Sequence, residues 1–197
     1  MILRVIREQA RPDEVDALCA AIDEKLGPSA HEVGGPIRFH CATRPAGDDV
    51  EALIIAFWGT FEAAADADAR GISALSIARS MLLRVEAAHF EIDETILRSS
   101  DEEPIAIRLG IGRFSKPGSD IEMLETLRQR VPLIGDEMTE AYVGRRMVDR
   151  SVEVTFVSAW QRLPTDRALE AAFWPDIALR YDEFTVEVYT TMGLSGS

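Results

Sequence analysis

The stretch Ser151–Trp160, Ser-Val-Glu-Val-Thr-Phe-Val-Ser-Ala-Trp, determines how the rest of the chain is interpreted. Its β-branched and aromatic residues, with no proline or glycine, predict a buried strand. An earlier stretch, Glu51–Trp58, reads Glu-Ala-Leu-Ile-Ile-Ala-Phe-Trp and predicts a second strand of the same kind. Each strand ends in a tryptophan, and each is followed by a short turn and a segment rich in alanine and acidic residues. The chain therefore contains two related halves, one around each strand.

The spacing between the halves supports a duplication. Trp160 follows Trp58 by 102 residues, and the same spacing relates two more pairs, Arg44 with Arg146 and His40 with Tyr142. From the tryptophan to the phenylalanine of the last predicted strand there are 32 residues in the first half and 24 in the second. The first half therefore carries about eight extra residues, which we place near 71–80.

Hydrophobic periodicity predicts the order strand, helix, strand, strand, helix, strand in each half. In the first half the strands are expected at 2–9, 37–44, 52–58 and 89–96. The helices are expected at 12–26, from 61 to about 70 and, after an interruption at Gly71, onward to about 85. In the second half the strands are expected at 105–114, 138–147, 151–160 and 184–191, and the helices begin after Ser119 and Thr165. The polar residues 98–103 have no periodicity and predict a linker, so the two domains are expected at 1–97 and 104–197.

A unit with this order forms a four-stranded antiparallel sheet with both helices on one face. The other face is apolar and has to be covered. Two units in one chain can cover each other by packing sheet against sheet. We therefore predict an α+β fold, with two ferredoxin-like βαββαβ repeats whose antiparallel sheets form an intramolecular α/β barrel.

Composition restricts the partners. The net charge of -13 repels phosphate backbones and anionic lipid, so neither nucleic acid nor a membrane surface is expected. The amino-terminal residues carry charges every third position, which is typical of neither a signal peptide nor a membrane span. Cys19 and Cys41 are interpreted as small core residues rather than a disulfide, and a reducing cytoplasm is the expected location. A homo-oligomer is compatible with the sequence.

The predicted fold resembles the dimeric α/β-barrel superfamily, here as a fused tandem, and in particular the antibiotic-biosynthesis monooxygenase-like domain. The residues that carry the resemblance are Val154–Trp160 with Ala168–Phe173 and, more weakly, Ile54–Trp58 with Phe61–Ala69. The resemblance implies a pocket for a small apolar or aromatic molecule. Some relatives oxidise polycyclic aromatic substrates with oxygen and without metal or flavin, so no cofactor is expected. Haem-degrading relatives use a pocket asparagine, and this chain contains no asparagine.

One face of the second predicted strand carries the candidate chemistry. His40 could take a proton from a phenolic substrate near neutral pH, with Tyr142 as its counterpart in the second half. The ligand-binding candidates are Arg38, Arg44 and Arg146, which could hold the resulting anion, and Trp58 and Trp160, which could line a flat pocket. The alternative is that the polar residues form a solvated rim and that the tryptophans close the core at the strand ends.

Other sites receive less support. The histidines are far apart and no metal-type spacing is present, so no metal site is expected. Asp66 and Asp68 do not share a helix face and are interpreted as solvated, and His89 is expected at the surface. Function therefore remains between two classes: an oxidoreductase resembling cofactor-independent monooxygenases, or a non-catalytic ligand-binding or assembly module of the same fold.

Overall fold

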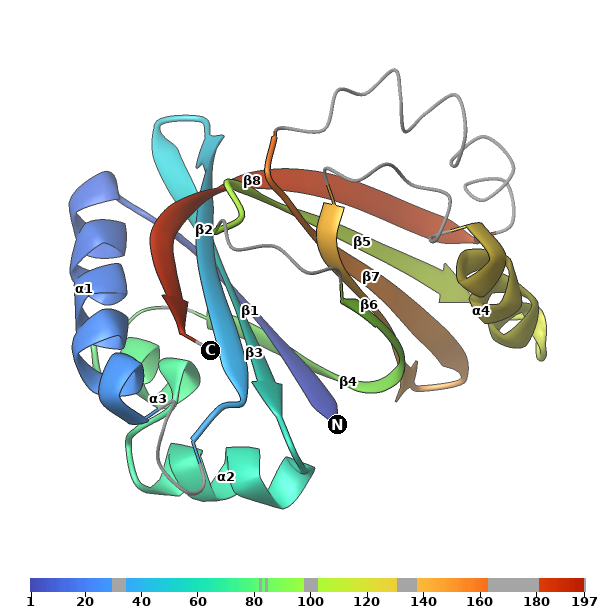
Figure 1. Cartoon of the computed structure of the whole chain (residues 1–197), viewed down its shortest axis with the longest axis horizontal. Coiled ribbons are helices and arrows are strands. Elements are labelled where there is room, and N and C mark those ends of the chain that lie inside the picture. The colour runs from blue at the N-terminus through green and yellow to red at the C-terminus, as the bar shows by residue number, and fades with distance from the viewer. Residues whose placement is uncertain are drawn as a thin grey trace. The chain divides into compact units, whose positions relative to one another are not determined.

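The computed structural model describes residues 1–29, 35–81, 83, 85–97, 103–130, 138–162 and 181–196. Most of the predicted linker at 98–103, and the predicted helix from Thr165 toward Trp174, lie outside these residues. The chain divides into two compact units, Met1–His89 with Tyr189–Ser197, and Phe90–Val188. Each unit is described by itself below (Figure 1).

The first unit is built around β3 (Asp49–Trp58), which lies between β1 (Ile2–Ala10) and β2 (Arg38–Ala46). All three strands are antiparallel neighbours, and Ile54 pairs with Ile6 on one side and Cys41 on the other. Nearly every residue of β3 from Ala52 onward is buried, as expected for a central strand with both faces covered.

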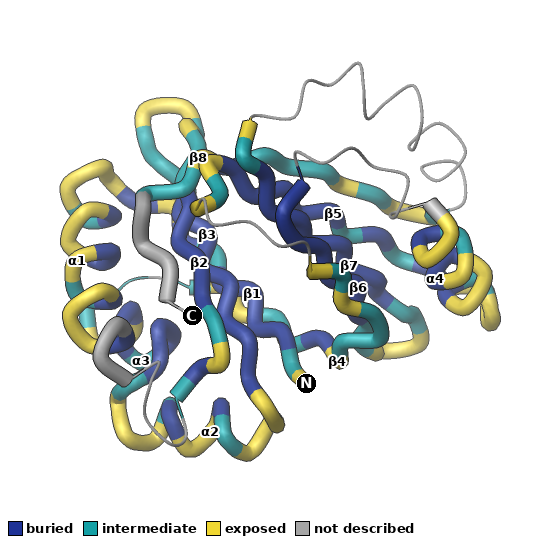
Figure 2. The backbone as a smooth tube through the Cα atoms, in the orientation of Figure 1, coloured by how far each residue is buried: buried dark blue, intermediate teal, exposed yellow. Residues whose placement is uncertain are grey.

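Three helices cover one face of this sheet: α1 (Pro12–Ser29), α2 (Phe61–Ala69) and α3 (Ala74–Ser80) (Figure 1). Their sheet-facing sides are buried and their outer sides exposed (Figure 2). Between helices and sheet lies an apolar core that includes Ile6, Leu18, Ile22, Phe39, Ile54, Trp58, Ala64, Ala67 and Ile77. Side chains cap two of the helices, because Thr60 accepts from the Ala63 N–H and Ser73 from the Ser76 N–H, which satisfies N–H groups left free at a helix start.

The extra residues predicted near 71–80 contain α3. One prediction in this region is wrong, since the helix does not continue to about Val85 but ends at Ser80, and β4 (Val85–Leu97) begins at Val85. The strand also begins before its predicted start at His89, since the alanines at 87 and 88 lack the branched side chains that usually mark a strand.

The second unit repeats the arrangement around β7 (Ser151–Trp160), which lies between β5 (Ala106–Phe114) and β6 (Met138–Val148). The helix α4 (Ser119–Arg130) packs Met123, Leu124 and Leu127 on this sheet. The Tyr181 ring approaches β5 closely at Gly112, where it occupies the space that a Cβ would take.

The division into compact units falls inside two long strands, β4 and β8 (Glu183–Gly196). Residues from Glu91 onward in β4 pair with β6, and the end of β8 pairs with β2. The boundary between the compact units therefore lies within β4 and β8 and not at residues 98–103. The repeat boundaries at 1–97 and 104–197 and the closure into an intramolecular barrel stay predictions.

The strand registers match between the units. Arg44 pairs with Glu51 in the β2–β3 hairpin, and Arg146 pairs with Glu153 in the β6–β7 hairpin, at the spacing of 102 residues. On the outer strands, Ile2 pairs with Trp58 and Ala106 with Trp160. The α+β class and the ferredoxin-like pattern of the prediction are therefore confirmed.

Candidate functional site

Arg4 places a charge where the first unit otherwise buries apolar groups. It lies on the face of β1 that α2 covers, and only 2% of its side chain is exposed. Its two terminal nitrogens donate to Asp68 of α2, with Nη1–Oδ1 at 2.6 Å and Nη2–Oδ2 at 2.9 Å. This bidentate geometry is the strongest form of an arginine–carboxylate pair. It offsets the desolvation free energy that burial of the guanidinium costs.

Two more polar side chains complete the pair. Arg4 Nε donates to Nε2 of His89, the β4 residue that lies beside it, at 2.7 Å. The Ser73 hydroxyl, fully buried at the start of α3, donates to Asp68 Oδ1. Because His89 Nε2 accepts this bond, its imidazole is held in a neutral tautomer. The ring of Phe61 meets His89 edge-on, with centroids 5.3 Å apart.

Trp58 lies against this group. The guanidinium carbon of Arg4 stands 5.8 Å from the centroid of the indole, within range of a cation–π contact. The indole is 1% exposed, and among the described residues its Nε1–H meets no acceptor. An unsatisfied buried donor is costly, and native proteins seldom leave one. We call Arg4, Trp58, Asp68, Ser73 and His89 the Trp58 cluster.

The second unit has the same framework with one difference. By strand register, Arg108 is the counterpart of Arg4 and Trp160 that of Trp58, and both are buried. Trp160 Nε1 donates to the Ser158 hydroxyl at 2.8 Å. The counterpart of Ser158 is Ala56, which has no acceptor to offer. The two tryptophans are therefore equivalent in place and different in hydrogen bonding.

The predicted residues of the first half lie on two different faces of the sheet. His40, Arg38 and Arg44 alternate along one face of β2, and His40 is 5% exposed with Phe57 edge-on at 6.4 Å. Trp58 lies on the opposite face, with the core under the helices. The structure does not bring His40 and Trp58 into one site.

Arg44 and Arg146 form repeat-related ion pairs on the face away from the helices. Arg44 Nη2 lies 2.6 Å from Glu51, which also accepts from the Tyr189 hydroxyl at 2.9 Å. Arg146 Nε lies 2.6 Å from Glu153, and Arg113 Nη2 holds the other oxygen of Glu153 at 2.7 Å. Burial raises the pKa of Glu153, but hydrogen bonds from Arg113 and Arg146 outweigh burial and lower the pKa overall.

Tyr142 is hydrogen-bonded to a residue of its own strand. It is 5% exposed, and its hydroxyl donates to Glu140 at 2.5 Å. A phenol that donates to a carboxylate serves a ligand poorly as a donor, since its proton is already engaged.

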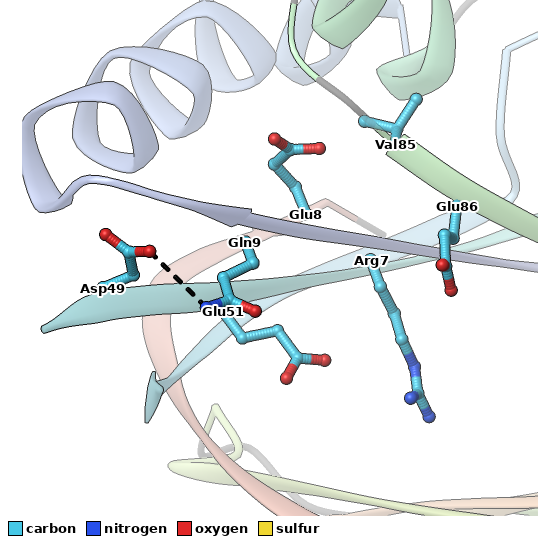
Figure 3. Close-up of a pocket in the computed structure, with 7 residues that line it drawn as sticks. All are labelled: Arg7, Glu8, Gln9, Asp49, Glu51, Val85 and Glu86. Atoms are coloured by element: carbon cyan, nitrogen blue, oxygen red, sulfur yellow. Dashed lines mark hydrogen bonds between the residues drawn. The ribbon is translucent and has the colours of Figure 1, made fainter. Parts of the chain in front are cut away.

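The hollow shown in Figure 3, of about 610 Å³, opens along β1 in the first unit. Glu8 and Val85 lie on one side of β1, and Arg7 and Glu51 on the other (Figure 3). Its lining consists of Arg7, Glu8, Gln9, Asp49, Glu51, Val85 and Glu86. Four carboxylates against one guanidinium make it unsuited to an anionic aromatic ligand.

Sequence reasoning missed Arg4, Ser73, Asp68 and His89. The interpretation of Asp68 as solvated is wrong, because it binds a buried arginine and is 25% exposed. One signal was available: Arg4 lies between Ile2 and Ile6 on the same face of β1. Within the described ranges no three His, Cys, Asp or Glu side chains gather as metal ligands. Also within these ranges, no helix is long and apolar enough to cross a membrane.

Solved structures share this fold across both halves. A proposed monooxygenase from Fusobacterium nucleatum is 13% identical, with a TM-score of 0.71 over 96% of this chain and 91% of its own. A proposed monooxygenase from Lactobacillus acidophilus is 11% identical, with a TM-score of 0.64 over 100% and 96%. An anthrone oxidase-like protein is 12% identical, with a TM-score of 0.62 over 98% and 92%.

The chain thus has a ferredoxin-like α+β fold similar to that of these solved structures, which is the fold that the sequence resemblance implied. No protein-family model and no curated protein sequence matches it. Identities this low concern the fold, and activity has to be argued from the site.

Proposed function

We propose that the chain binds a planar hydroxylated or keto-aromatic molecule at the Trp58 cluster and oxidises it with dioxygen. The observation that supports this most is the Trp58 indole N–H, which meets no acceptor among the described residues although it is buried beside a cationic side chain. An oxygen of the ligand would satisfy that N–H, and Arg4 would stabilise the negative charge once the oxygen is ionised.

Each residue has a role in this proposal. His89 Nε2 is the base: it accepts a substrate proton when Arg4 turns from it onto the new oxyanion. Asp68 holds Arg4 in either position through the other guanidinium nitrogens. The substrate anion reduces dioxygen, the carbon–oxygen bond forms, and the peroxide loses water. In balance, a ring CH2 and O2 become C=O and H2O, so no external reductant is needed.

The test compares the two tryptophans. The protein is mixed with a panel of hydroxylated polycyclic aromatics and anthrones, and both Tm and oxygen consumption are followed. A ligand at about 100 times its Kd should stabilise the fold by about 2.7 kcal/mol. Trp58→Phe should remove this effect and the oxygen uptake, and the control Trp160→Phe should keep both. Equal loss in both variants, or no response to any compound, contradicts the proposal.

A second function is favoured by the burial of Arg4, whose bonds to Asp68 and His89 are complete without a ligand. In that case the cluster fastens α2 to the sheet, and the chain is a binding or assembly module. A rise in Tm without oxygen consumption identifies a binding module. The absence of both, with normal folding, identifies an assembly module.

A further inference from the structure

Three sulfur atoms meet under α1, on the side of the first unit's core away from the Trp58 cluster. Cys19 of α1 and Cys41 of β2 are 3% and 1% exposed. Cys19 Sγ lies 3.3 Å from Sδ of Met192 in β8. Cys41 lies close enough to Cys19 for the two thiols to shift each other's pKa in opposite directions, so the three sulfur atoms gather in one place.

A break in strand register brings the thioether to this place. In the β2–β8 pair, His40 faces Ser195 and Ala42 faces Thr191, so β8 spends four residues where β2 spends two. Met192 lies in this bulge on β8, and Cys41 is the β2 residue at the same break in register. Bulges redirect side chains and are frequent beside functional sites. A regular pairing of β2 with β8 would not need the additional residues of this bulge.

The surroundings suit a soft cation. The neighbours of Cys19 and Met192 are apolar and include Ala10, Val15, Val50 and Ala52. In the described part of the chain no third His, Cys, Asp or Glu joins the two cysteines, so the four-ligand set of a structural zinc site is not assembled there. Thiolates with a thioether select Cu(I), which is stable with few, soft ligands in a dry site.

We propose that Cys19, Cys41 and Met192 form a Cu(I) site. Copper binds the two thiolate sulfurs and the thioether sulfur, and the two thiol protons leave to solvent, so each Cu(I) bound releases two protons. No electron is transferred. The site is separate from the proposed oxidation and does not depend on it.

The experiment titrates the reduced, full-length protein with Cu(I) without oxygen, against a chromophoric Cu(I) chelator. One Cu(I) per chain should be retained, with thiolate-to-copper absorption in the ultraviolet and proton release to a weak buffer. Met192→Leu conserves volume and should fold normally, but it should lose affinity by about 10- to 100-fold, the range for disturbed metal sites. Cys19→Ser should lose the absorption as well.

The matched control is Met147→Leu, at a methionine that is 69% exposed, which should bind as the wild type does. Zn²⁺ should compete poorly. The proposal is overturned if the reduced wild type retains no copper, or if Met192→Leu and Met147→Leu bind copper equally. Circular dichroism of each variant excludes loss of the fold as the cause.

Discussion

Trp160 donates its indole hydrogen to Ser158 at 2.8 Å, whereas Trp58, its counterpart in the first unit, lies beside Ala56, which has no acceptor. One hydroxyl therefore distinguishes two buried tryptophans that the duplication placed in the same position. The difference indicates which half can still accept a ligand: the donor is engaged in the second unit and available to a ligand oxygen in the first. Exchanging the two residues tests this directly.

Ala56→Ser should give Trp58 the acceptor that it lacks. A new buried hydrogen bond contributes about 0.5–1.5 kcal/mol, so thermal or denaturant unfolding should show equal or greater stability. Ligand-induced stabilisation should fall, because the serine competes with the ligand oxygen. A variant that binds the aromatic panel as the wild type does would refute this role of Trp58.

Ser158→Ala should have the opposite effect in the second unit. It leaves the Trp160 N–H buried without its acceptor, which costs about 1–3 kcal/mol of unfolding free energy. Binding at the first unit should persist. Urea titration checks stability, and the ligand panel at a temperature well below the variant's Tm checks binding. Unchanged stability would mean that another group satisfies Trp160.

Arg4 and Asp68 should be strongly coupled. Removing one partner of a buried pair costs about 3–5 kcal/mol, and because Asp68 is a quarter exposed we expect the lower end for Arg4→Met. In a double-mutant cycle with Asp68→Leu, the double variant should lose less than the sum of the single losses by at least about 1 kcal/mol. Additive losses would show that the pair contributes little to the cluster.

Gly112→Ala should destabilise the second unit. A Cβ at this position would lie 1.9 Å from Cε1 of Tyr181, so the ring has to move from its tilted contact with Phe114 and its stack on Phe184. Forced repacking of this kind costs about 1–3 kcal/mol. Gly47→Ala is unsuited as a control, since its φ of 71° strains any other residue, but Gly59→Ala meets no atom within 4 Å and should cost little on this account. Equal stability of the two variants would show that the Tyr181 ring does not obstruct a side chain at position 112.

Glu153 should make part of the stability depend on pH. Arg113 and Arg146 lower its pKa in the folded state, so its contribution is complete above the unfolded pKa and is lost as pH falls through the folded pKa. The wild type should therefore exceed Glu153→Gln in stability near pH 7, and the gap should narrow below about pH 4.3, the usual carboxyl value. A gap that stays constant from neutral to acid pH would argue against this ion pair.

The sequence was sufficient for the parts of the fold that depend on periodicity. The strand ending in Trp58 is apolar on both faces, which is typical of a central strand, and β3 lies between β1 and β2. The helical run predicted to reach Val85 ends at Ser80 and β4 begins at Val85, because local helix preference is a weak guide that tertiary context overrides.

The site could be predicted less well, because it depends on side chains that meet across long separations. Arg4 and Asp68 are 64 residues apart, and Arg4 and His89 are 85 apart. Nothing local in the sequence links them. The face shared by His40 and Arg44 followed from alternation, but alternation does not say which face of a sheet meets the helices, so Trp58 was grouped with residues on the opposite side.

The most direct measurement is a nitrogen–proton correlation spectrum of the indole groups, of which the chain has three. Tryptophan-to-phenylalanine variants assign the signals, and the best ligand of the aromatic panel is then added. The account predicts a large shift of the Trp58 indole signal on binding and almost none of the Trp160 signal. A Trp58 signal that stays in place while ligand is bound, or an equal movement of the two, would contradict it.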